Sequence, residues 1–175
     1  MSGTVPPGRV LVAGVGNIFL GDDGFGVEVV RRLSALPMPA HAELVDTGVR
    51  GVHLAYQLLD DYRTVVLVDA TARGCEPGTV YLIEARLPEP EEQPAAVLDG
   101  HRMTPDAVLA VLGTLTAGLG SAGPERVLVV GCEPQTLDEG VGLSPVVEAA
   151  VDEAVQVVLG LLEEAGRTPA ALGTR

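Results

Sequence analysis

The sequence contains no lysine, few aromatic residues and only two cysteines. Eleven basic residues, all arginine, face 24 acidic residues, so the formal net charge is -13 at pH 7. Nucleic-acid binding needs a positive surface and stacking rings, and three tyrosines and two phenylalanines without a basic stripe disfavour it. An anionic membrane surface would also repel this chain. A basic or metal-bearing partner suits the acidic charge better.

Long apolar runs are also missing. No run reaches the ~18 residues of a membrane span, and the first residues, MSGTVPPG, lack the basic and apolar regions of a secretion signal. Cys75 and Cys132 are isolated, with no C-x-x-C, which argues against a zinc knuckle or a redox pair. We therefore expect a reducing, cytoplasmic setting. Cys132 ends an apolar run, which favours a small buried side chain.

Patterns typical of strands and helices alternate along the chain. Strands are expected at 9–15, 42–46, 64–70, 79–84 and 126–132, and helices at about 24–36, 50–60, 104–118 and 144–164. This alternation predicts an α/β fold whose mainly parallel sheet is covered on both faces. The fourth strand follows the third too closely for a crossover helix, so we expect it to run antiparallel at an edge.

One domain is expected over residues 1–175, with a core at about 9–164 and flexible ends at 1–8 and 165–175. The segment 86–100 is proline-rich and acidic, which predicts a long loop of the kind that is often functional. Thr104 and Pro105 are typical of a helix start, so His101 is placed in that loop.

A glycine turn followed by two carboxylates lies between the first strand and the first helix. The dinucleotide motif G-x-G-x-x-G fails because Phe19 stands at its third glycine. The phosphate loop fails because Asp22 and Asp23 replace its lysine and hydroxyl, and they would repel a triphosphate. The turn therefore favours a cation, or a ligand carrying one. The alternative is that Asp22 caps the helix and Asp23 favours its positive end.

Acidic residues follow three strands of the predicted sheet: Asp23 after the first, Asp46 at the end of the second and Asp69 at the end of the third. Ligands of open α/β sheets bind outside the carboxyl ends of the strands, so these acids are candidate ligands. Desolvating Asp69 after such an apolar run is costly without a partner or a metal. The alternative for Asp69 is a cap or turn role beside Ala70 and Thr71.

The chain has three histidines. His41, in a proline-rich turn, and His53, on a helix, are interpreted as exposed or structurally satisfied. His101 precedes a helix N-terminus, which favours the neutral imidazole that binds metal. Two carboxylates and one imidazole would suit a divalent ion such as nickel, zinc, iron or manganese.

Four separated stretches resemble the hydrogenase maturation protease family. They are GVGNIFLGDDGFGVEVV, LVDTGVRG, VVLVDA and GCEPQTLDEGVGLSPVVEAAVDEAV, in matching order over about residues 9–160. The resemblance implies a single-domain three-layer sandwich of the phosphorylase/hydrolase-like type, with a twisted, mostly parallel five-stranded sheet between helices. It also implies an endopeptidase that trims the large subunit of nickel-iron hydrogenases.

By this resemblance, Asp23, Asp69 and His101 form the metal-binding and catalytic triad. Arg102 follows the histidine where relatives often carry glycine. Asp46, with Gly48 and Gly51, matches a turn that shapes the cleft rather than binding metal.

The resemblance further implies that the enzyme has no constitutive cofactor. It would recognise nickel already inserted in the [NiFe] hydrogenase large-subunit precursor and then remove a short C-terminal peptide, while a surrogate divalent ion would fit the same site. The nickel would polarise the scissile carbonyl or activate a water. The alternatives are a non-cleaving nickel escort protein, a hydrolase such as peptidyl-tRNA hydrolase, and a nucleotide-binding protein.

Overall fold

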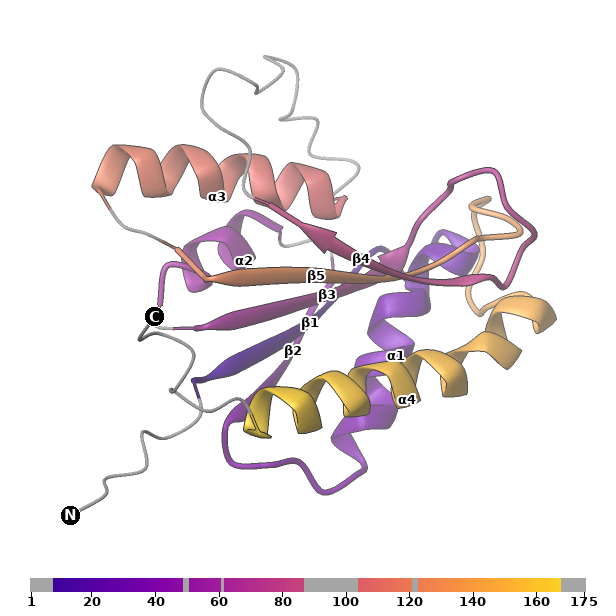
Figure 1. Ribbon diagram of the computed structural model, residues 1–175. Coiled ribbons are helices and arrows are strands. Elements are labelled where there is room, and N and C mark those ends of the chain that lie inside the picture. The colour runs from indigo at the N-terminus through magenta and orange to yellow at the C-terminus, as the bar shows by residue number, and fades with distance from the viewer. Residues whose placement is uncertain (1–7, 49–50, 61, 87–103, 121–122, 168–175) are drawn as a thin grey trace.

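The structure is a computed structural model that describes residues 8–48, 51–60, 62–86, 104–120 and 123–167 (Figure 1). Its five-stranded sheet has the order β2-β1-β3-β5-β4. The strands are β1 (Val10–Val15), β2 (Ala42–Gly48), β3 (Thr64–Ala70), β4 (Val80–Ala85) and β5 (Arg126–Cys132). All neighbouring pairs are parallel except β4 with β5. The predicted α/β class and the antiparallel edge strand are therefore confirmed.

Helices cover both faces of the sheet (Figure 1). They are the 3-10 helix η1 (Gly21–Gly24) and the α-helices α1 (Phe25–Ser34), α2 (Gly51–Gln57), α3 (Pro105–Leu119) and α4 (Pro145–Arg167). Thr104 begins α3 as predicted, since its Oγ1 accepts a hydrogen bond from the backbone N–H of Ala107 at 3.2 Å. None of the helices in the described ranges has the length and hydropathy that crossing a membrane requires.

Alternate side chains of the strands fill two separate cores, one on each face of the sheet. On one face, Val12, Val66 and Val130 belong to a cluster with residues of α1 and α4. On the other face, Ala13 and Leu67 belong to a cluster with residues of α2 and α3. Strands that are buried on both faces need continuous apolar runs, which explains why the valine-rich segments form the centre of this sheet.

Several predicted boundaries differ from the structure by one to three residues. β2 continues past Asp46 to Gly48, because its pairing with β1 resumes at Val15 after a shift in register. α2 is shorter than predicted, and α4 extends to Arg167, three residues beyond the predicted core. The predicted loop 86–100 lies outside the described residues except at its first position, and so do most of the predicted flexible ends.

The strand order changes direction at the centre of the sheet. From β1 the chain passes through α1 to β2 on one side, and then returns to β3 on the other side of β1. In open α/β sheets the carboxyl edge at such a switch point is where ligands bind. The topology therefore indicates the segments that follow β1 and β3.

Two glycines allow the glycine turn and α1 to pack directly on these strands. Gly16 has φ +126°, and a Cβ there would lie 2.0 Å from the backbone oxygen of Asp23 and 3.0 Å from Oδ1 of Asp69. A Cβ at Gly26 would lie 2.0 Å from the backbone oxygen of Val68. A side chain at either position would force η1 or α1 away from β3, so these glycines bring Asp23 to the end of that strand.

Candidate active site

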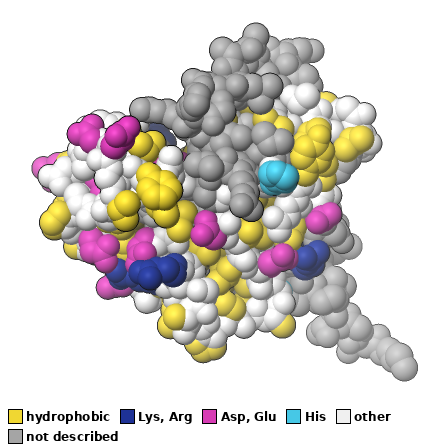
Figure 2. Space-filling model, turned by 180° about the vertical axis from the view of Figure 1, so that it is seen from behind, with side chains coloured by type: hydrophobic (Ala, Val, Ile, Leu, Met, Phe, Trp, Pro, Cys, Tyr) yellow, Lys and Arg dark blue, Asp and Glu magenta, His cyan; other side chains and the backbone are white. Residues whose placement is uncertain are grey.

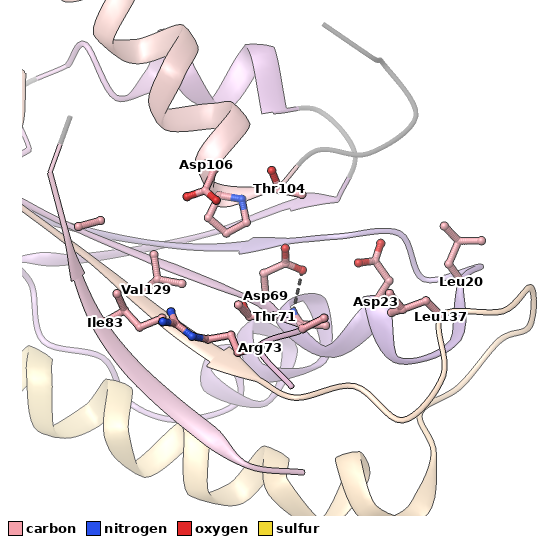
Figure 3. Close-up of a pocket in the computed structure, with 14 residues that line it drawn as sticks. Leu20, Asp23, Asp69, Thr71, Arg73, Ile83, Thr104, Asp106, Val129 and Leu137 are labelled. Carbon is pink, nitrogen blue, oxygen red and sulfur yellow. Dashed lines mark hydrogen bonds between the residues drawn. The ribbon is translucent and has the colours of Figure 1, made fainter. Parts of the chain in front are cut away.

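A cavity of about 350 Å³ lies at the carboxyl edge of the sheet, at the switch point between β1 and β3 (Figure 3). Asp23 and Asp69 both line it. Its apolar walls include Leu20, Leu137 and Val129. The cavity therefore combines two carboxylates from different strand ends with apolar surface, as peptide and small-molecule sites often do.

Asp23 is half-buried in η1, and its side chain points into the cavity (Figure 3). Its Oδ2 accepts a hydrogen bond from the backbone N–H of Asn17 at 2.7 Å. Asn17 lies in the glycine turn, so the turn that brings η1 to the strand ends also orients this carboxylate. Asp23 therefore has a defined orientation in the cavity rather than a freely rotating side chain.

Asp69 lies within β3 and is only 2% exposed. Its Oδ1 accepts a hydrogen bond from the backbone N–H of Ala70 at 2.8 Å. Both residues lie in β3, so this bond is a contact within the strand and not the cap of a turn or helix that the sequence offered as an alternative. Burial and then the negative charge of Asp23 raise the pKa of Asp69 well above its usual range, although the bond from Ala70 acts in the opposite direction. Such a carboxyl group can hold a proton or exchange it for a cation.

The raised pKa of Asp69 gives a testable dependence of stability on pH. The unfolded chain releases this proton near pH ~3.9 but the folded chain keeps it to higher pH, so the wild-type free energy of unfolding falls over that interval. We expect Asp69→Asn to abolish this fall and to be more stable than wild type at pH 7. Urea unfolding of both proteins at pH 4 and pH 7 measures the difference. If Asp69→Asn were more stable than wild type by the same amount at both pH values, the pKa of Asp69 would not be raised in the folded chain.

Asp22 does not cap α1, which corrects one interpretation from the sequence. η1 and α1 have no side-chain cap, and Asp22 is fully buried against the loop between β5 and α4. Its Oδ2 accepts from the backbone N–H groups of Gln135 at 2.8 Å and Thr136 at 3.0 Å, and its Oδ1 accepts from the N–H of Ser144 at 2.7 Å. The Ser144 hydroxyl donates to Oδ2 at 2.9 Å. Asp22 is therefore a structural anchor for this loop.

The remaining predicted candidates have different outcomes. His101 lies outside the described residues, and among the residues that are described no group of three His, Cys, Asp or Glu side chains is placed to hold a metal ion. Asp46 is exposed and is not among the residues that line the cavity. His53 is exposed, while the Nε2 of His41 lies 3.1 Å from the backbone oxygen of Leu162. Both histidines are thus as the sequence predicted.

The sequence reasoning missed Glu133, which follows β5 directly and is 6% exposed. Its carboxylate accepts from the backbone N–H groups of Arg73 at 2.7 Å and Gly74 at 3.1 Å, and from the hydroxyl of Tyr81 at 2.7 Å. Burial alone would raise the pKa of Glu133, but these hydrogen bonds outweigh it and lower the pKa. Glu133 therefore stays ionised and holds the segment that carries Arg73 along one wall of the cavity. The same rule of acids at strand ends would have found it.

These features define an α/β protein with paired carboxylates in a cavity at the switch point of its sheet. A family profile described as hydrogenase maturation protease matches residues 27–161. The chain is 30% identical to the hydrogenase 2 maturation protease of Escherichia coli over 161 residues, which cover 90% of this chain and 93% of that protein. It is 34% identical to the hydrogenase expression/formation protein HupD of Rhodobacter capsulatus, over 85% of this chain and 69% of that protein.

Solved structures agree with the sequence comparison. The hydrogenase maturating endopeptidase HybD from E. coli is similar with a TM-score of 0.71 and 30% identity, over 90% of this chain and 94% of that one. A hydrogenase 2 maturation peptidase from a Thaumarchaeota archaeon is similar with a TM-score of 0.65 and 32% identity, over 88% and 97%. The chain belongs to the hydrogenase maturation protease family.

Proposed function

We propose that this protein is an endopeptidase that removes the C-terminal peptide from a nickel-loaded [NiFe] hydrogenase large-subunit precursor. One observation carries the proposal: in a member of this family, Asp23 and Asp69 line a single cavity at the switch point of the sheet. The names of the relatives support hydrogenase maturation as the process and endopeptidase as the activity.

The nickel is part of the substrate in this proposal. Carboxylate oxygens of Asp23 and Asp69, with an imidazole nitrogen of His101, would recognise an ion that the precursor already carries, and the enzyme needs no metal of its own. Mixed nitrogen and oxygen donors suit a borderline divalent ion of this kind. The support for His101 comes from the sequence alone.

The ionisation of Asp23 and Asp69 is expected to favour binding of a cation. The charge of Asp23 and the burial of Asp69 both disfavour ionisation of Asp69 in the free protein. A divalent ion between the two groups would reverse this preference, because it stabilises both negative charges. A precursor without nickel brings no positive charge to offset the cost of ionising Asp69, which gives a physical basis for discrimination between loaded and unloaded substrate.

The bond-breaking step uses the same ion. Nickel next to the scissile peptide would polarise its carbonyl group, or a water on the nickel would act as the nucleophile. The apolar side chains of Leu20, Leu137 and Val129 offer contacts for the peptide.

Cysteine chemistry does not fit this cavity. Burial, followed by the charges of Asp22 and Glu133, raises the pKa of the Cys132 thiol to about 12, so the thiolate nucleophile is scarce at neutral pH. Cys75 is exposed and is not among the residues that line the cavity. We expect a Cys75→Ser, Cys132→Ala double variant to keep cleaving precursor, provided that circular dichroism shows it folded. Complete loss of cleavage in a folded double variant would contradict a metal-assisted mechanism.

The proposal is tested with purified precursor in two forms, nickel-loaded and nickel-free. The expected result is a loss of mass at the C-terminus of the loaded form alone, measured by intact-protein mass spectrometry. Binding of the loaded precursor without any loss of mass would instead identify a nickel escort protein. Equal cleavage of both forms would contradict nickel recognition while leaving the peptidase activity in place.

A further inference from the structure

Large apolar side chains are exposed on the two loops that also contribute Leu20 and Leu137 to the lining of the cavity. The exposed fraction is 44% for Ile18, 62% for Phe19 and 78% for Val141. We call these three residues the apolar rim. Leu20 and Leu137, which lie on the same loops, continue the apolar surface into the cavity. Figure 2 shows hydrophobic side chains gathered at this end of the molecule, on the left of the view, with acidic side chains beside them.

The rim is held by hydrogen bonds rather than by packing of its own side chains. The backbone N–H of Phe19 donates to Oδ1 of Asn17 at 2.9 Å. Gly140 joins the second loop to the first, because its N–H donates to the Phe19 oxygen and its oxygen accepts from Gly21, both at 2.9 Å. Asp22 fixes the second loop to η1. The loops therefore present Phe19 and Val141 in a fixed arrangement, which lowers the entropic cost of binding a partner.

Exposed aromatic and aliphatic side chains that are held rigidly beside a site are typical of a protein-binding surface. The loops do not need Phe19 for their own packing, since its side chain is mostly in solvent. Asp138 and Glu139 are exposed directly before Gly140 and Val141, and the whole chain carries a net charge of -13. A partner of complementary chemistry would present an apolar segment with basic residues next to it.

We propose that the apolar rim is the docking surface for the large-subunit precursor, and that it binds an apolar segment flanked by basic residues close to the cleavage site. This inference rests on the proposed function and adds a binding surface to it. Phe19 directly precedes Leu20, and Val141 lies on the same loop as Leu137, so the rim and the lining of the cavity share both loops. A second copy of this protein fits less well, because two rims flanked by the same acidic residues would repel each other.

The test compares a Phe19→Ser, Val141→Ser variant with wild type and with Leu119→Ser. Leu119 is a matched control because it is 67% exposed at the C-terminal end of α3 and does not line the cavity. If the rim is the docking surface, the rim variant should have a KM for nickel-loaded precursor at least about tenfold higher than wild type. Its Kd for the same precursor, measured by bio-layer interferometry, should rise by a similar factor. The kcat at saturating precursor and the values for Leu119→Ser are expected to stay unchanged. The conservative single variant Phe19→Leu is expected to keep most of the wild-type affinity for precursor, because leucine is also a large apolar side chain.

Each result separates the docking proposal from the proposed function. Unchanged KM and Kd in a folded rim variant would overturn the docking surface even if cleavage is normal. If wild type binds precursor without cleaving it, the Kd still tests the rim, and only the proposed function fails. If light scattering gives the rim variant a lower mass than wild type while its KM is unchanged, the rim is a contact between copies of this chain. That result would also overturn the proposal.

Discussion

Asp23→Asn is expected to lower the rate of precursor cleavage by about 10²- to 10⁴-fold, which is the range for loss of a group that acts on the reacting atoms. The asparagine keeps the size of the side chain and an oxygen that can accept from the Asn17 N–H, so the glycine turn should stay in place. It removes the negative charge that would attract the nickel and that contributes to the raised pKa of Asp69. The measurement is single-turnover cleavage of nickel-loaded precursor, followed by mass spectrometry.

Asp60→Asn is the matched control for this loss. Asp60 is exposed in the turn between α2 and β3 and does not line the cavity, so its variant should cleave at the wild-type rate. A combination of Asp23→Asn with Asp69→Asn should be little slower than the slower single variant, because residues that act as one unit are not additive. Cleavage by Asp23→Asn within about threefold of wild type would remove Asp23 from the reaction.

The fold was predictable because its strongest signals are local. The apolar runs at Val65 and Val127 are continuous, as buried parallel strands require, and both become central strands. The short connection before Val80 excluded a crossover helix, and the strand there is indeed antiparallel. The extension of β2 to Gly48 was missed because it depends on pairing with Val15, a contact with a distant part of the chain.

The site was only partly predictable, for a related reason. The rule that ligands lie beyond strand ends correctly brought Asp23 and Asp69 to one cavity, because the topology of the sheet decides it. The same rule does not separate Asp22 from Asp23, since the two are adjacent in sequence and both follow β1. Their roles differ because η1 turns one carboxylate towards the cavity and the other towards a loop that lies more than a hundred residues further along the chain.

Asp22→Asn should therefore unfold more easily, whereas Asp23→Asn should lose activity. Both Asp22 oxygens accept backbone N–H groups, so whichever oxygen the amide nitrogen replaces, at least one buried donor loses its acceptor. Together with the lost charge, we expect the free energy of unfolding to fall by about 3 kcal/mol. Ser144→Ala removes only the hydroxyl donor to Asp22 and should cost about 1 kcal/mol.

The loss of unfolding free energy in Asp22→Asn should also depend on pH. The charge of Asp22 stabilises the folded chain at higher pH, whereas ionisation of Asp69 destabilises it there. Burial raises the pKa of Asp22, but the hydrogen bonds from Ser144, Thr136 and Gln135 outweigh it, so the folded-state pKa is lowered. The stabilisation from its charge is then present above the unfolded pKa of ~3.9 and is lost as the pH falls through the folded value. Urea unfolding at pH 7 and at pH 3 should show a large difference between wild type and Asp22→Asn at pH 7 that narrows at pH 3. A difference that does not change with pH would mean that the anchor of the loop is not the charged form of Asp22.

Because the same loop carries Val141, the Asp22→Asn variant should also bind precursor more weakly than wild type. The loss of affinity should exceed what the smaller folded fraction of the variant explains.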